Sequence, residues 1–124
     1  MELHGVHHVS LNVDDIETTG RFYRDVLGLE QIDRPDFGFP GLWFQAQGQE
    51  IHLIQVEKHQ APEGQHFAFR VADLDRARAE LEEKGVKVSK AFEIPGVGRQ
   101  AFLRDPAGNQ IELNQPLLSR VSAG

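Results

Sequence analysis

The sequence predicts an α+β fold made of two copies of one unit, each a strand, a helix and three further strands. Two observations carry this prediction. The segment HVSLNVDDIETTGRFYRDVLGL, from His8, matches HFAFRVADLDRARAELEEKGVKV, from His66, with paired residues 58 positions apart. In both segments apolar residues first alternate, as in a strand, and then recur at helical spacing. The length of 124 residues fits one domain.

The predicted helices have similar ends in the two copies. An aspartate precedes each helix and a glycine follows it: Asp14 or Asp15 and Gly28 in the first copy, Asp73 and Gly85 in the second. Aspartate accepts hydrogen bonds from the unpaired N–H groups at a helix start. Glycine suits the left-handed conformation that often ends a helix. The helices are therefore expected to begin and end at equivalent places.

Three strands are expected to close each copy. The last of them read IHLIQ at 51–55 and IELNQ at 111–115, so His52 corresponds to Glu112. The segment DPAGN at 105–109 predicts a hairpin turn before the final strand. We expect a single domain at 1–124, with one module at about 4–58, a second at about 64–116 and a tail at 117–124.

Composition excludes several classes of function. The formal net charge is −6 and lysine and arginine do not cluster, which argues against a nucleic-acid surface. Cysteine is absent, so disulfides, thiolate nucleophiles and cysteine-based metal sites are excluded. No long apolar run or basic leader opens the chain, so we expect neither export nor membrane insertion. The expected location is the cytoplasm.

Strand alternation places one metal-ligating side chain on the polar face of each of four strands. These residues are His8, His52, His66 and Glu112. His7 falls on the apolar face, which should pack under the helices. A lone histidine in a strand is usually an ordinary polar residue, but four agreeing registers favour a shared site. Three imidazoles and a carboxylate suit one divalent ion: zinc, nickel, manganese or iron.

The same motifs resemble a known superfamily. HHVSLNVDDIETTGRFYRDVLGL, HFAFRVADLDRARAELEEKGV and RDPAGNQIELNQ are similar to the vicinal oxygen chelate superfamily, over nearly the whole chain from His7 to Gln115. That superfamily includes glyoxalase I, methylmalonyl-CoA epimerase, extradiol dioxygenases, fosfomycin-resistance enzymes and bleomycin-binding proteins. The resemblance implies paired βαβββ modules in a cupped mixed sheet around a divalent metal, with the helices outside, commonly in a homodimer.

The resemblance also implies roles for single residues. The superfamily's metal ligands fall on His8, His66 and Glu112, which look like the two-histidine, one-carboxylate set of extradiol dioxygenases. His52 takes a variable position, typically glutamate in glyoxalase I and glutamine in methylmalonyl-CoA epimerase, and is expected to be a fourth ligand or a catalytic base. The bleomycin-binding branch has generally lost these ligands, so retaining all four argues against that branch.

The favoured function is a metal-dependent, glyoxalase-like isomerase or lyase acting on a small oxygen-chelating substrate. The ion would stabilise an enolate while Glu112 or His52 removes the proton next to the carbonyl. One alternative is an Fe(II) extradiol-type dioxygenase that uses His8, His66 and Glu112. Another is a non-catalytic protein that binds a small molecule such as an antibiotic.

Four further residues are candidates for substrate binding. Arg70 falls by register on the face of the proposed ligands, and Trp43 and Phe37 lie where they can wall a pocket. Arg99 flanks the last hairpin and can hold an anionic group. Ordinary packing for the aromatic residues, and a solvated surface role for Arg99, are the competing interpretations.

Overall fold

The computed structural model describes residues 1–117, so most of the predicted tail lies outside the described residues. The chain divides into two compact units. Unit 1 comprises 1–61 together with the turn at 105–108, and unit 2 comprises 62–104 with the described residues from 109 onward. Unit 1 covers the predicted module at about 4–58, and unit 2 covers the predicted module at about 64–116 apart from the turn at 105–108. The units are described separately below.

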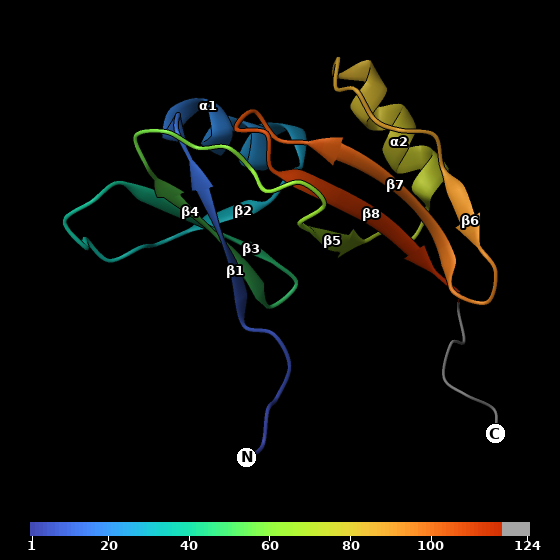
Figure 1. The fold of residues 1–124 in the computed structure, drawn as a ribbon, viewed down its shortest axis with the longest axis horizontal. Helices are drawn as coiled ribbons and strands as arrows, with labels where there is room; N and C mark the ends of the chain where they lie inside the picture. Colours follow the sequence, from blue (N-terminus) through green and yellow to red (C-terminus); the bar gives the residue numbers. More distant parts are fainter. Residues whose placement is uncertain (118–124) are drawn as a thin grey trace. The chain divides into compact units, whose positions relative to one another are not determined.

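Unit 1 is a four-stranded sheet with a helix on one face (Figure 1). Its elements are β1 (His8–Val13), α1 (Ile16–Arg21), η1 (Phe22–Val26), β2 (Glu30–Ile32), β3 (Gly41–Ala46) and β4 (Gln49–Gln55). The strand order is β1-β4-β3-β2, with β1 parallel to β4 and the other pairs antiparallel. Helix α1 packs on β3 and β4.

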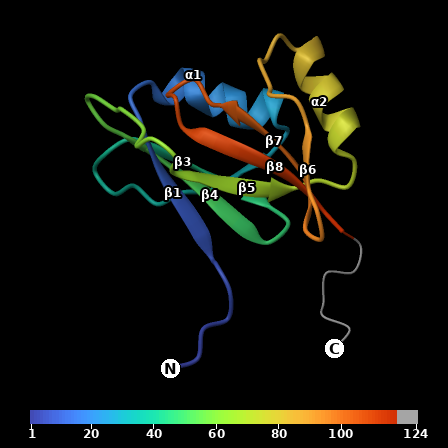
Figure 2. The same ribbon diagram turned by 45° about the vertical axis from the view of Figure 1, so that its right-hand side comes forward.

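Unit 2 repeats this arrangement, with α2 beside β7 and β8 (Figure 2). Its elements are β5 (His66–Arg70), α2 (Leu74–Glu83), β6 (Phe92–Ile94), β7 (Gly98–Arg104) and β8 (Gln110–Pro116). The order β5-β8-β7-β6 matches that of unit 1, and β5 is again parallel to β8. The predicted α+β fold with two strand–helix–strand–strand–strand modules is confirmed.

The apolar face of each sheet forms a core under its helix, as the alternation predicts. In β4, Ile51 and Leu53 are 4% and 0% exposed, and in β8 Ile111 and Leu113 are 0% and 4% exposed. The opposite face of each sheet carries the polar residues. Register therefore sorts the side chains of the two units in the same way.

The first helix differs from its prediction in its last turn. A single helix was expected from residue 16 to the glycine at 28, but after Arg21 the backbone continues as the π-helix η1. The N–H of Leu27 donates to the carbonyl of Phe22, five residues back, at 3.0 Å. This turn holds Tyr23, which is 0% exposed and donates its hydroxyl to Oδ2 of Asp105 at 2.7 Å.

A glutamine ties the end of the last strand to the start of the helix in both units. Oε1 of Gln55 accepts from the N–H of Ile16 at 2.8 Å, and Oε1 of Gln115 accepts from the N–H of Leu74 at 2.8 Å. The expected aspartate caps are also present, with Asp15 rather than Asp14 in the first helix. The final glutamines of IHLIQ and IELNQ therefore have one shared structural role.

Replacing Gln115 by leucine is expected to destabilise the protein by about 1 kcal/mol, because the N–H at the start of α2 loses its acceptor. Leucine nearly matches glutamine in volume, so the loss reports mainly on the hydrogen bond. Urea unfolding followed by circular dichroism measures the change. Gln100→Leu in β7 is the matched control, since the side chain of Gln100 makes no hydrogen bond within residues 1–117. Equal losses in the two variants would contradict this role.

Candidate functional site

His8 and His52 come together on the polar face of unit 1. Ser10 is the direct neighbour of His52 across β1 and β4, so His8 lies one side-chain repeat away on the same face. The two imidazole rings stack with centroids 4.1 Å apart and an interplanar angle of 16°. These two histidines therefore share the polar face of unit 1, as strand alternation predicts.

His52 is enclosed on both faces of its ring. Trp43, its direct neighbour on β3, stacks against it at 4.1 Å with an interplanar angle of 7°, while His8 covers the other face. The residue is only 7% exposed. A histidine so enclosed has its ring plane fixed by packing rather than by solvent.

Glu50 is a partner of His52 that the sequence analysis missed. Its Oε1 lies 2.8 Å from Nε2 of His52, and its side chain is 23% exposed. The hydrogen bond from His52 is the main cause that lowers the pKa of Glu50. The signal was available in the sequence, because residues two apart on a strand share a face.

His66 and Glu112 form the corresponding pair in unit 2. Nε2 of His66 lies 3.1 Å from Oε1 of Glu112, and Oε2 of Glu112 accepts from Nδ2 of Asn114 at 2.8 Å. Nδ1 of His66 lies 3.0 Å from the carbonyl oxygen of Gly64. Glu112 is 8% exposed, so its charge is largely removed from water.

The contact with Gly64 fixes which ring nitrogen of His66 has a lone pair. A carbonyl only accepts hydrogen bonds, so Nδ1 of His66 must carry the hydrogen, and in the neutral ring Nε2 then has the lone pair. That lone pair faces the carboxylate of Glu112, an arrangement that favours a cation between the two atoms. Histidine ligands of metals characteristically donate their other ring N–H to a carbonyl or a carboxylate. The donor set in unit 2 therefore fits a divalent ion.

An aromatic residue flanks each of these pairs at an equivalent place. Trp43 is paired by register with His52, and Phe102 is paired with Glu112. The ring of His66 meets Phe102 edge-on, with centroids 5.3 Å apart and planes at 88°. Phe102 was absent from the predicted site because its strand was not aligned with the first module at that position.

The two candidate arginines lie on opposite faces of the sheet of unit 2. Arg70 is exposed on the same face as Glu112, two residues beyond the alanine paired with that glutamate. Arg99 lies on the helix-covered face, where its guanidinium donates to both carboxylate oxygens of Asp75 at 2.8 and 3.2 Å. This pairing lowers the pKa of Asp75 and raises that of Arg99. Arg70 remains a candidate for binding substrate, whereas Arg99 is placed away from Glu112.

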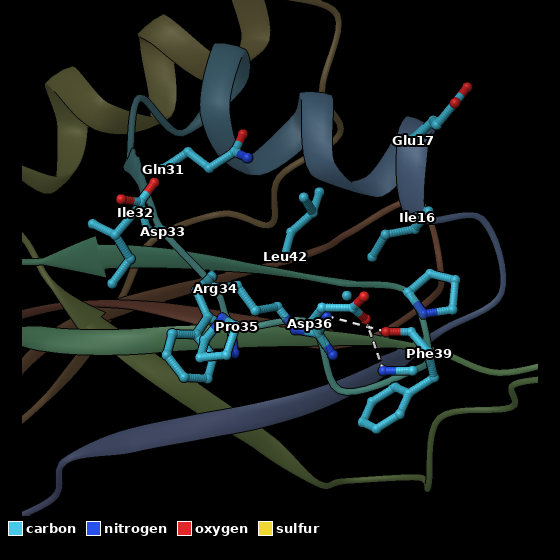
Figure 3. Close-up of a pocket in the computed structure, with 14 residues that line it drawn as sticks. Ile16, Glu17, Gln31, Ile32, Asp33, Arg34, Pro35, Asp36, Phe39 and Leu42 are labelled. Carbon is cyan, nitrogen blue, oxygen red and sulfur yellow. Dashed lines mark hydrogen bonds between the residues drawn. The ribbon is translucent and has the colours of Figure 1, made fainter.

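A pocket of about 790 Å³ lies within unit 1 beside Trp43, between the start of α1, β2 and the connector to β3 (Figure 3). Arg34 borders it, with its guanidinium carbon 4.9 Å and 5.0 Å from the ring centres of Phe37 and Phe39. Nη1 of Arg34 donates to the carbonyl of Phe39 at 3.1 Å. Phe37 also contacts Trp43, with centroids 6.0 Å apart. The two predicted aromatic residues therefore lie together next to this pocket.

Each unit taken alone supplies a pair of candidate ligands. Within residues 1–117, neither unit gathers three or more histidine, aspartate or glutamate side chains into a group arranged to hold a metal ion. Unit 1 offers His8 and His52, and unit 2 offers His66 and Glu112.

Comparison with known proteins identifies the superfamily. The family model described as Glyoxalase/Bleomycin resistance protein/Dioxygenase superfamily matches residues 5–113. The chain belongs to this superfamily. The resemblance to the vicinal oxygen chelate superfamily is therefore confirmed, and with it the class of fold.

Three known proteins are similar to this chain over nearly its whole length. Glyoxylase I 4 of Arabidopsis thaliana is 30% identical, over 91% of this chain and 71% of that protein. A putative glyoxalase family protein from Bacillus anthracis superposes with a TM-score of 0.86 at 28% identity, covering 94% of this chain and 98% of that one. TnmS3, an antibiotic binding protein from Streptomyces sp. CB03234, superposes with a TM-score of 0.78 at 32% identity, covering 94% of this chain and 99% of that one.

The similar proteins thus include ones named as a glyoxylase and as an antibiotic binding protein. The described part of the chain contains no helix long and apolar enough to span a membrane. The choice between catalysis and binding therefore depends on the side chains of the site.

Proposed function

We propose that this chain is a divalent-metal-dependent enzyme of the glyoxalase type, which moves a proton next to a carbonyl group of a small oxygen-chelating substrate. The observation that carries the proposal is the orientation of His66, whose Nδ1 is held by Gly64 while Nε2 faces Glu112. The similarity to Glyoxylase I 4 supports the same reaction class. The proposal holds equally if the two ligand pairs come from one copy of the chain or from two.

The ligands would be His8, His66 and Glu112, with His52 beside them as a further ligand or as a base. A divalent ion held there would act as a Lewis acid that makes a C–H bond next to a chelated carbonyl more acidic. Glu112 is the carboxylate of this set, and Asn114 fixes one of its oxygens. Glu112 would receive the proton from carbon, and His52 is the competing base.

Trp43 and Phe37 would bound the substrate on the side of unit 1, next to the pocket at Arg34. Arg70 would hold an anionic group on the face of Glu112, because it is exposed there and makes no ion pair within the described residues. Arg99 is left out of the proposed site, since Asp75 holds it on the other face.

Elemental analysis of the purified protein tests the metal. We expect close to one zinc, nickel, manganese or iron per site, retained through gel filtration and removed by a chelator. A preparation that contains no metal and also fails to bind any of these four ions would contradict the proposal. The identity of the ion separates the reaction classes, because iron would favour the dioxygenase alternative.

Proton transfer is tested directly by isotope exchange. In deuterium oxide, the metal-loaded protein should exchange the hydrogens next to the carbonyl of small hydroxy ketones and keto acids, followed by proton NMR. Consumption of oxygen with catechols and no such exchange would instead indicate an extradiol dioxygenase. Each result is compared with the same protein after chelation.

A second candidate function is sequestration of a small molecule without turnover. It is favoured by the similarity to the antibiotic binding protein TnmS3 and by the half-exposed Phe37 beside the pocket. Tight binding of an aromatic compound that survives removal of the metal would support it.

The homodimer and the cytoplasmic location stay predictions. Light scattering of the purified protein tests whether it is a homodimer.

A further inference from the structure

Arg34, in the connector between β2 and β3, places its guanidinium on the polar face of unit 1. A Cβ atom added to Gly41 would lie 2.7 Å from both Cζ and Nε of Arg34. Gly41 and Trp43 are two residues apart on β3, and Trp43 pairs by register with His52. The guanidinium therefore takes the place of the missing Gly41 side chain, on the face that carries His52.

The guanidinium of Arg34 carries five N–H donors but makes one hydrogen bond within residues 1–117. Nη1 donates to the carbonyl oxygen of Phe39 at 3.1 Å. Arg34 forms no ion pair in this part of the chain, although Asp36 is close by in sequence, because Asp36 accepts from the N–H of Gly38 at 2.8 Å. Arg34 is also half-buried. A fixed, planar donor group of this kind suits the two oxygens of a carboxylate.

Aromatic rings adjoin this donor group. Cζ of Arg34 lies 4.9 Å and 5.0 Å from the ring centres of Phe37 and Phe39, which stack with centroids 6.0 Å apart. Phe37 also contacts Trp43, again with centroids 6.0 Å apart. Phe37 and Phe39 are 52% and 46% exposed, so about half of each side chain is open to a ligand. A ligand that reaches Arg34 can therefore bury an aromatic ring against this wall.

Acidic residues limit which anion can bind. Glu17, Asp33 and Asp36 line the neighbouring pocket together with Arg34 (Figure 3). Figure 3 shows Glu17 pointing away from Arg34, whereas Asp33 and Asp36 belong to the same connector. Their charges repel a multiply charged anion such as phosphate more than a carboxylate with a single charge. The surroundings therefore favour one negative charge on an aromatic body.

We propose that Arg34, with the rings of Phe37 and Phe39, binds the carboxylate of an aromatic carboxylic acid on the polar face of unit 1. Two residues of a strand span about 7 Å, so this carboxylate would lie about 7 Å along the sheet from the row of Trp43 and His52. That spacing is close to the separation of two groups at opposite ends of a benzene ring. The inference names a substrate class and rests on the proposed function for turnover, whereas binding of the acid needs no metal.

The first experiment titrates metal-free, full-length protein with benzoate. Two-dimensional ¹H–¹⁵N NMR follows the Nε–H of Arg34 and the indole N–H of Trp43, the single tryptophan of the chain. Benzoate should shift both signals to saturation, and inorganic phosphate should shift neither. Absence of any benzoate shift at millimolar concentration would overturn the proposal. Phosphate that binds as tightly as benzoate would overturn the class of ligand.

Variants separate binding of the charge from support of the aromatic wall. Arg34→Gln should weaken benzoate binding at least about tenfold, the usual loss for a hydrogen bond to a charged group. Benzamide, the neutral counterpart, should lose less affinity in the same variant. Equal losses for the two compounds would show that Arg34 only supports the wall. Arg21→Gln is the matched control, because Arg21 lies on α1 and donates to Thr18. Its benzoate affinity should equal that of the wild-type protein.

The second experiment measures turnover by the metal-loaded protein in deuterium oxide. The substrates are 4-(hydroxyacetyl)benzoate, which carries a hydroxy ketone opposite a carboxylate, and its neutral methyl ester. The acid should have the lower KM, and Arg34→Gln should raise the KM of the acid alone with kcat unchanged. Equal KM values in the wild-type protein would overturn the substrate class. Exchange of neither compound would contradict the proposed function, while the benzoate titration still decides the role of Arg34.

Discussion

Replacing Glu112 by glutamine is expected to reduce metal-dependent proton exchange at least about 100-fold, the usual contribution of a positioned general base. Glutamine keeps the length of the side chain and an oxygen for Asn114, but it removes the negative charge that faces Nε2 of His66. Metal affinity should fall as well, because a neutral amide is a poorer ligand for zinc or nickel than a carboxylate. Proton NMR in deuterium oxide and titration calorimetry measure the two losses.

The matched control is Glu93→Gln in β6. It makes the same change of charge in the same unit, but Glu93 pairs by register with Arg99 on the face opposite Glu112. Its exchange rate and its metal affinity should equal those of the wild-type protein. An unchanged rate in Glu112→Gln would remove Glu112 from the mechanism, and equal losses in both variants would indicate a general effect of charge.

Replacing Tyr23 by phenylalanine is expected to lower the free energy of unfolding by about 1–3 kcal/mol. The hydroxyl of Tyr23 donates to Oδ2 of Asp105 at 2.7 Å, and the two residues are 0% and 4% exposed. The variant therefore leaves a buried carboxylate with one donor fewer. Urea unfolding measures the loss, and a change below about 0.5 kcal/mol would show that the carboxylate finds another donor.

The same hydrogen bond predicts a loss of stability at alkaline pH. Burial is the main cause that raises the pKa of Tyr23 above its ordinary value of 10.0, and the charge of Asp105 adds to it. When the pKa of a group is higher in the folded than in the unfolded protein, the group stabilises the fold fully at pH values below its pKa in the unfolded protein. That contribution is lost as the pH rises above 10.0.

Tyr23 is the only tyrosine, so tyrosinate absorbance reports on it alone. The folded protein should show none where a free tyrosine is half ionised, and the absorbance should appear together with unfolding. Reversible ionisation near pH 10.0 with unchanged far-ultraviolet circular dichroism would contradict the burial of this hydroxyl.

Much of the fold could be predicted because the internal repeat and the alternation of apolar residues agree. The π-helical turn at 22–26 could not, because its apolar residues fit an α-helix equally well. This turn holds Tyr23, whose hydrogen-bond partner Asp105 lies far away in the chain. The roles of Gln55 and Gln115 were also missed, although both end the aligned motifs.

The candidate site could be predicted where strand register alone determines which side chains share a face of the sheet. Register puts His66 and Glu112 on one face, and the structure brings them into contact. Charge pairing across elements was not predictable in this way. Arg99 pairs with Asp75 of α2, because side-chain reach selects this partner after the strands are aligned. The pairing of Glu50 with His52 was missed although both lie on one face of β4.

The glutamine hydrogen bonds described above also bear on how the two halves of the chain differ. Gln55 and Gln115 perform the same task in both halves, yet three residues earlier the halves differ, with His52 in one and Glu112 in the other. The supporting hydrogen bond is the same in both halves, while the candidate site position differs. Residues 52 and 112 are therefore the natural places to exchange side chains when the halves are re-engineered, because the bonds that set each helix lie elsewhere.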